Sequence, residues 1–139
     1  MENRILADTN ICLDLLLDRK PFVEHSGKLF ELAESKSIRL YISGLSIDTL
    51  FYIIRPAMGS RKSTEILSAL LEFAEIAPVN NDVVRDALRA GWNDLEDALQ
   101  YYSAVHANCT HLITRYLRDF SLAEGSGLPI LTPKQFLEG

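Results

Sequence analysis

Four aspartates have the type and spacing that could hold a divalent metal ion: Asp8, Asp94, Asp97 and Asp119. Asp94 and Asp97 are three residues apart, so both would project from one face of a helix's first turn. Carboxylates held that close repel each other unless a cation or a hydrogen-bond network balances their charge. Oxygen ligands suit the hard cations Mg²⁺ and Mn²⁺, and one or two such ions could activate water and stabilise a leaving oxygen at a phosphate.

Each aspartate also has a simpler structural explanation. Asp8 and Asp94 could be helix N-caps, and Asp119 could be a turn residue. Asp97 is harder to explain in this way, because its apolar neighbours on the same helix are expected to be buried. The placement of the four at the ends of three separate elements favours a site over unrelated caps and turns.

Short apolar runs alternate with helical periodicity, and this alternation predicts the elements that position the aspartates. Strands are expected at residues 4–7, 38–43, 77–79, 111–114 and 128–131. Helices are expected at residues 11–17, 45–55 (closed by Pro56 and Gly59), 63–76, 81–90 and 94–107, with one more capped by Ser26 and a terminal turn from Pro133. The strand at 77–79 should lie near a sheet edge, because Pro78 cannot donate a ladder hydrogen bond.

Strands separated by helices imply β-α-β units with right-handed crossovers. The sequence therefore predicts an α/β fold, a three-layer α/β/α sandwich with a central parallel sheet of four to five strands. Ligands bind beyond the carboxyl ends of the strands in such sheets. Asp8, Ser43 and Thr114 stand at the ends of three expected strands, so a site is predicted at this edge.

Length and composition exclude several classes of protein. The chain has 139 residues, 47% of them apolar and 24% charged, which predicts one domain over residues 1–139. It lacks an apolar run of about 18 residues and a signal-peptide pattern, so neither a membrane span nor secretion is expected. Its two cysteines favour reduced thiols in a cytoplasmic protein. The net charge of −5 disfavours charge-driven nucleic-acid binding, although four of the negative charges belong to the proposed site.

Short motifs, in order, resemble the PIN-domain family over essentially the whole chain. The motifs are residues 5–10 (Ile-Leu-Ala-Asp-Thr-Asn), 40–43 (Leu-Tyr-Ile-Ser), 94–101 (Asp-Leu-Glu-Asp-Ala-Leu-Gln-Tyr), 114–120 (Thr-Arg-x-x-x-Asp-Phe) and 131–133 (Leu-Thr-Pro). The resemblance implies a parallel sheet flanked by helices. Many PIN domains are metal-dependent ribonucleases, and a large bacterial and archaeal group are VapC-like toxins held by a cognate antitoxin.

The resemblance also implies roles for individual residues. Asp8, Asp97 and Asp119 would occupy the acidic metal positions, with Asp94 as an accessory acid. The supporting residues would be Thr9 and Asn10, which orient Asp8 or touch the phosphate, Ser43, which supports Asp8, and Thr114 and Arg115, which lie beside the site.

One position departs from the family pattern. The family usually places a Glu on the helix after the second strand, and the aligned residue here is Thr49. Asp48 is one residue away, an offset that rotates it by about 100° around a helix. Three alternatives stay open: Thr49 acts through water, Asp48 substitutes after a register change, or the site is impaired.

The leading hypothesis is an endoribonuclease that uses Mg²⁺ or Mn²⁺, the toxin of a toxin–antitoxin pair. The alternative is a PIN-fold RNA- or protein-binding regulatory module with weak or no catalysis. A phosphatase of the haloacid dehalogenase type is a third possibility, although Asn10 replaces the second acid of its Asp-x-Asp motif. The apolar helices at 45–55 and 63–76 leave surface for a partner, either an antitoxin or a second copy of the chain.

Several further residues are candidates for nucleic-acid or metal binding. The basic residues predicted to contact an RNA backbone are Arg55, Arg61, Lys62, Arg115 and Arg118. His106, Cys109 and His111 have a spacing that is not typical of zinc sites, and a fourth ligand is missing. We therefore expect these three residues to be structural.

Overall fold

The computed structural model of the chain describes residues 2–139 and contains one sheet of five parallel strands. The strands are β1 (Arg4–Ala7), β2 (Arg39–Ser43), β3 (Ala74–Ala77), β4 (His111–Ile113) and β5 (Ile130–Leu131). Their order across the sheet is β3-β2-β1-β4-β5, which leaves β1 in the centre. The helices are α1 (Thr9–Leu16), α2 (Val23–Glu34), α3 (Gly44–Leu70), α4 (Asn81–Ala90), α5 (Leu95–His106) and α6 (Pro133–Glu138), with a 3₁₀ helix η1 (Leu117–Ala123).

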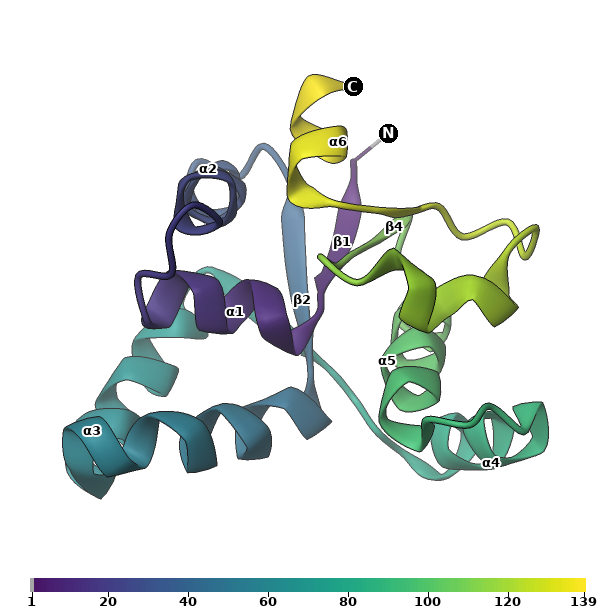
Figure 1. Ribbon diagram of the computed structural model, residues 1–139, viewed down its shortest axis with the longest axis horizontal. Helices are drawn as coiled ribbons and strands as arrows, with labels where there is room; N and C mark the ends of the chain where they lie inside the picture. The colour runs from purple at the N-terminus through teal and green to yellow at the C-terminus, as the bar shows by residue number, and fades with distance from the viewer. Residues whose placement is uncertain (1) are drawn as a thin grey trace.

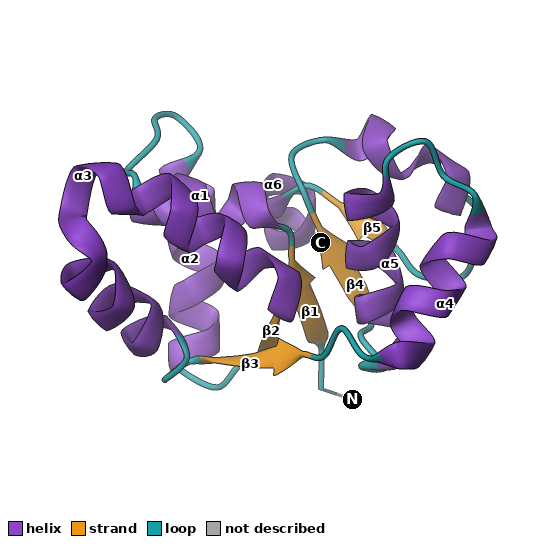
Figure 2. Ribbon diagram, turned by 90° about the horizontal axis from the view of Figure 1, so that it is seen from below, coloured by secondary structure: helices purple, strands orange, loops and turns teal. Residues whose placement is uncertain are grey.

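The helices form two layers, one on each face of the sheet. Helices α1, α2 and α3 lie on one side and α4 and α5 on the other, as Figures 1 and 2 show. Alternate residues of β1 point to opposite faces: Ile5 and Ala7 belong to the core under α1–α3, while Leu6 packs in a second core with Tyr101 and Phe120. The predicted three-layer α/β/α sandwich with a parallel sheet is confirmed.

The structure differs from the sequence prediction around residues 71–79. The helix predicted at 63–76 is wrong in its last turn, because α3 ends at Leu70 and residues 74–77 form strand β3. The strand predicted at 77–79 is therefore displaced toward the amino terminus. Local periodicity continues through this segment, but pairing with β2 satisfies the backbone groups of that strand, and such long-range pairing overrides local preference. The edge position of the strand is confirmed.

Two predicted helix boundaries also differ. Helix α3 continues through Pro56 and changes direction at Gly59, whose φ of 81° and ψ of 162° are favoured only by glycine. Helix α2 begins at Val23, so Ser26 is not its cap but a fully buried residue inside it. Within residues 2–139, the helices all fall short of the length and apolar character that a membrane crossing requires.

Candidate metal centre

Asp8 lies where β1 turns into α1, and three donors hold its carboxylate. Its Oδ1 accepts a hydrogen bond from the backbone N–H of Thr9 at 2.7 Å, which makes Asp8 the N-cap of α1. Its Oδ2 accepts from Asn10 Nδ2 and from the Thr114 hydroxyl, both at 2.9 Å. Burial raises the pKa of Asp8, which is 6% exposed, and these hydrogen bonds oppose the rise. The fixed carboxylate has little freedom to turn away from the sheet edge.

Two of the expected supporting side chains contact other residues. The Ser43 hydroxyl accepts from the backbone N–H of Leu45 at 3.3 Å, so it caps α3, and it lies 3.2 Å from Ser103 Oγ rather than on Asp8. The side chain of Thr9 lies against Ser46 and not toward solvent. The expectation that Ser43 supports Asp8 directly does not hold in this geometry, because the helix N–H group uses its hydroxyl.

The acids of α5 lie close to Asp8 and Asp119. Asp94 is the N-cap of α5, and its Oδ1 accepts from the backbone N–H of Asp97 at 3.1 Å. Burial raises the pKa of Asp97, and the charges of Asp94, Asp119, Asp8 and Glu96 add to the rise, which brings the pKa to about 7. Asp97 is therefore within electrostatic range of the other three predicted aspartates, although the four come from three separate parts of the chain.

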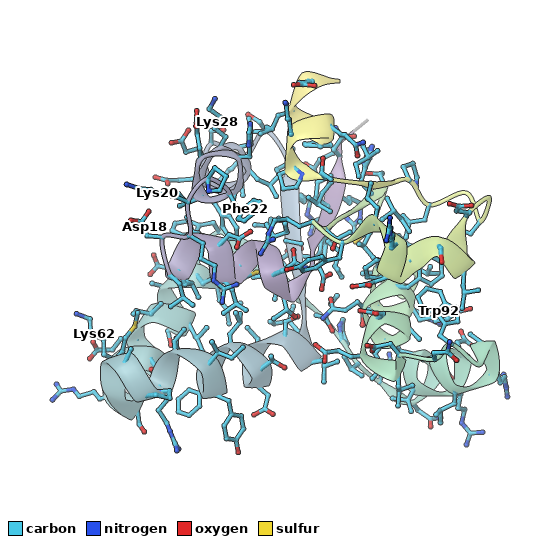
Figure 3. All side chains as sticks on the ribbon, viewed as in Figure 1. Asp18, Lys20, Phe22, Lys28, Lys62 and Trp92 are labelled. Atoms are coloured by element: carbon cyan, nitrogen blue, oxygen red, sulfur yellow. The ribbon has the colours of Figure 1, made fainter. Side chains whose placement is uncertain are left out.

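No basic side chain balances this charge among the residues that the structure describes. Of the ion pairs formed by residues 2–139, none includes Asp8, Asp94, Asp97 or Asp119. An open pocket of about 330 Å³ is lined by Asp94, Asp97 and Asp119 together with Arg118 and Trp92, and the stick view places Trp92 beside α5 (Figure 3). The donor atoms and the unbalanced charge fit a divalent cation.

The side chains do not yet form a closed set of ligands. Within residues 2–139, no group of three or more His, Cys, Asp or Glu side chains is close enough to hold a metal ion as it stands. Asp94 and Asp119 are exposed, although Asp94 is held by its cap hydrogen bond to Asp97, whereas Asp8 is buried and fixed by three donors. An ion would therefore have to draw the exposed carboxylates toward Asp8 and Asp97.

Thr49 and Asp48 take different positions on α3. The Thr49 hydroxyl donates to the carbonyl of Leu45 in the preceding turn, at 3.5 Å. Asp48 is exposed and lines a groove with Phe51 and Thr64, between the two segments of α3. Of the alternatives for the missing Glu, the geometry disfavours substitution by Asp48.

Arg115 is held by a buried acid that the sequence analysis did not single out. Its Nε donates to Asp14 Oδ2 at 2.6 Å and its Nη2 to Asp14 Oδ1 at 3.1 Å, and Asp14 is fully buried. The guanidinium also lies over the ring of Phe22, 3.8 Å from its centroid. Only the backbone N–H of Arg115 reaches the site, where it donates to Asn10 Oδ1 at 3.1 Å. A lone Asp inside the apolar run of residues 11–17 was the signal that could have revealed this pair.

The remaining basic and zinc candidates are dispersed. Arg55, Arg61 and Lys62 lie on α3 near its bend, and Figure 3 shows Lys62 at the left edge of the molecule. Arg118 alone of the predicted RNA contacts shares the pocket of the aspartates. His106 pairs with Asp86 at 2.7 Å, and His111 lies 2.8 Å from Thr110 Oγ1. The two histidines therefore serve separate local contacts, in line with the structural reading.

The sequence matches a protein-family model, and the structure resembles several solved structures. The family model described as PIN domain matches residues 4–117. A search of curated protein sequences finds no match. A toxin–antitoxin complex from Klebsiella pneumoniae contains a similar chain, with a TM-score of 0.69 and 23% identity over 93% of this chain and 97% of that one.

Two further solved structures are similar over most of the chain. DNA-bound VapBC from Salmonella typhimurium has a TM-score of 0.71 and 19% identity, covering 96% of this chain and 99% of that one. VapC20 from Mycobacterium tuberculosis, a toxin that cleaves the sarcin-ricin loop, has a TM-score of 0.61 and 14% identity, covering 78% and 86%. At identities this low, the structural similarity shows a shared fold alone.

Proposed function

This chain belongs to the PIN domain family, and from that premise we propose that it is a metal-dependent endoribonuclease, the toxin of a toxin–antitoxin pair. The observation that carries the proposal is the set of four aspartates without a salt-bridge partner in the described chain, of which Asp97 has its pKa raised by burial and by the charges of the other three. The family match also removes the haloacid dehalogenase alternative. The similar chains from toxin–antitoxin complexes support the biological role.

Asp8, Asp97 and Asp119 would hold one or two Mg²⁺ or Mn²⁺ ions, with Asp94 as an accessory ligand. A bound ion would supply Lewis-acid chemistry, lowering the pKa of water and neutralising charge at the phosphate. Asn10 and Thr114 both donate to Oδ2 of Asp8 and so hold its carboxylate in one orientation. Asp97 must lose its proton before it can act as a ligand. In the hydrolysis, the oxygen of water would bond to phosphorus, the bond from phosphorus to the 3′ oxygen would break, and the proton lost by water would end on that 3′ oxygen.

RNA recognition would depend on a few local contacts. The chain is acidic overall, and phosphate binding normally requires a basic surface. Arg118 lies beside the aspartates and is the basic residue best placed to contact a phosphate next to the cleaved bond. The other predicted contacts, Arg55, Arg61 and Lys62, lie on α3 and would meet only a longer RNA. Weak non-specific affinity follows from this distribution.

The proposed antitoxin would bind along α3. Tyr52 and Ile53 are exposed there, at 62% and 42%, and the adjacent groove is lined by Ile47, Phe51 and Leu71. Apolar surface of this extent on one helix is typical of a protein-binding face. Similar chains were solved within complexes that contain antitoxins, which favours an antitoxin over a second copy of the chain as the occupant.

A cleavage assay tests the proposed activity. The purified chain should cut a single-stranded RNA in Mn²⁺, and EDTA or the substitution Asp8→Asn should abolish the cutting. Cleavage that survives both controls would contradict a metal mechanism at these aspartates.

A second candidate function is a PIN-fold regulatory module with little catalysis. Two observations favour it. The Thr49 hydroxyl hydrogen-bonds to a carbonyl of its own helix, and the described aspartates do not form a closed set of metal ligands. Calorimetry with Mn²⁺ separates the two candidates. Heat of binding at micromolar to millimolar concentration supports the ribonuclease, and no binding in that range supports the regulatory module.

A further inference from the structure

Beneath the aspartates, three buried side chains from three helices hydrogen-bond to one another. Nε2 of Gln100 on α5 donates to Ser46 Oγ on α3 at 2.7 Å and to Thr9 Oγ1 on α1 at 3.2 Å. The hydroxyls of Thr9 and Ser46 lie 2.7 Å apart. Gln100 and Ser46 are fully buried, and Thr9 nearly so. We call this group the Thr9–Ser46–Gln100 triangle; the helices that supply it meet near the ends of β1 and β2 (Figure 1).

The triangle connects the two parts of the chain that carry Asp8 and Asp97. Thr9 follows Asp8, and its backbone N–H donates to Asp8 Oδ1 at 2.7 Å. Gln100 lies three residues after Asp97, so the two side chains share one face of α5. Hydrogen bonds from Gln100 therefore tie the helix of Asp97 to the residue that holds Asp8.

Burying the polar side chain of Gln100 at this position costs free energy. Its Oε1 is buried and has no hydrogen-bond partner in the described chain. A buried polar group without a partner destabilises a protein, whereas an apolar side chain of the same size avoids this penalty. Stability alone would favour such an apolar residue, so the retained amide points to a role in the site.

We propose that Gln100 is a positioning residue, which sets the separation of Asp97 and Asp8 so that both can bind the same divalent cations. This inference rests on the proposed function. Asp8 is fixed by its three donors, while Asp97 depends on the placement of α5. Without the amide of Gln100, α5 loses its hydrogen bonds to Thr9 and Ser46 and can shift relative to Asp8.

The test compares Mn²⁺ affinity with thermal stability in the full chain. Gln100→Met keeps the size of the side chain and removes both the amide donor and the unpartnered oxygen. We expect the dissociation constant for Mn²⁺ to rise about tenfold, while the melting temperature of the metal-free protein stays the same or rises. A purely structural role predicts the opposite pattern, a lower melting temperature with unchanged Mn²⁺ affinity.

Ser103→Ala is the matched control. Ser103 lies three residues further along α5, is fully buried, and pairs with Ser43 rather than with the triangle. This variant should bind Mn²⁺ as the parent does. Ser46→Ala removes a partner of Gln100 without enlarging any side chain, and it should weaken Mn²⁺ binding in the same direction as Gln100→Met.

The outcomes separate this inference from the proposed function. A parent chain that binds no Mn²⁺ contradicts the metal-dependent function and the positioning role with it. A parent that binds Mn²⁺ while Gln100→Met and Ser46→Ala bind it equally well contradicts the positioning role alone. A loss of affinity that Ser103→Ala shares also overturns the specific role of Gln100.

Discussion

The guanidinium of Arg115 donates to both carboxylate oxygens of Asp14, a residue with no exposed surface. Asp14 belongs to α1 and Arg115 follows β4, so the pair joins two segments about a hundred residues apart in the sequence. These two segments also carry Asp8 and Thr114, which contact each other directly. A structural ion pair therefore lies behind the candidate site, and it explains why Arg115 is not free to bind RNA.

Arg115→Met should destabilise the protein by about 3 kcal/mol, because it leaves the buried Asp14 without its main partner. Arg39→Met is the matched control, since Arg39 also pairs with a carboxylate, that of Glu75, but both side chains are well exposed. The control should cost clearly less, because water screens an exposed pair. Urea denaturation of the metal-free proteins measures both values, and equal losses would contradict the importance of the buried pair.

The stability of the metal-free protein should depend on the proton of Asp97. The pKa of this carboxyl rises from 3.8 to about 7 on folding, first through burial and then through the neighbouring aspartates. Between these values the native state holds a proton that the unfolded chain has released, so stability falls as pH rises through this window and is flat above it. Asp97→Asn should therefore raise the free energy of unfolding at pH 8 by about 1 kcal/mol, after allowance for screening of a partly exposed group.

Denaturation at pH 5 and pH 8 checks this sign. When the pH is lowered from 8 to 5, the parent should gain more stability than Asp97→Asn does. Glu34→Gln, a variant at an exposed position on α2, should show the same gain as the parent. Mn²⁺ should reverse the trend, because binding requires the deprotonated carboxylate. A variant with the same pH dependence as the parent would show that Asp97 is not the responsible group.

Thr114 and Ser43 both end strands of the sheet, but only Thr114 contacts Asp8. Thr114→Val keeps the shape and removes the donor, so it should weaken Mn²⁺ binding about tenfold by loosening the Asp8 carboxylate. Ser43→Ala should leave Mn²⁺ affinity unchanged and cost about 1 kcal/mol of stability through the lost cap of α3. Calorimetry with both variants measures the contrast. Similar Mn²⁺ affinities in the two variants would argue against support of Asp8 by Thr114.

The sequence was sufficient to predict the sheet and the end of it that carries polar residues. Residues 5–7 and 112–113 are short apolar runs, each followed by a polar residue (Asp8 and Thr114), and this pattern needs no tertiary information. Strand β3 could not be predicted in register, because its residues continue the periodicity of α3 and only pairing with β2 selects a strand. The same limit applies to Ser26, whose type suits a helix cap but which lies inside α2.

Within the candidate site, residue types were easier to predict than their hydrogen-bond partners. Asn10 and Thr114 were expected near Asp8 and both donate to it. Ser43 was expected there too, but a helix N–H group competes for its hydroxyl. Gln100 was not singled out, because a polar residue within a helix gives no sign of its partners until α1, α3 and α5 are packed together.

If these aspartates direct water to the phosphate of RNA, the chemistry of the product ends will show it. An RNA cut in Mn²⁺ and H₂¹⁸O should carry a free 3′ hydroxyl on one fragment and a 5′ phosphate with one ¹⁸O atom on the other, as mass spectrometry would detect. Asp8→Asn should give neither fragment. A 2′,3′-cyclic phosphate, or cutting that stops when the 2′ hydroxyl is removed, would show that the RNA's own hydroxyl is the nucleophile. Either result would contradict hydrolysis by water at these aspartates.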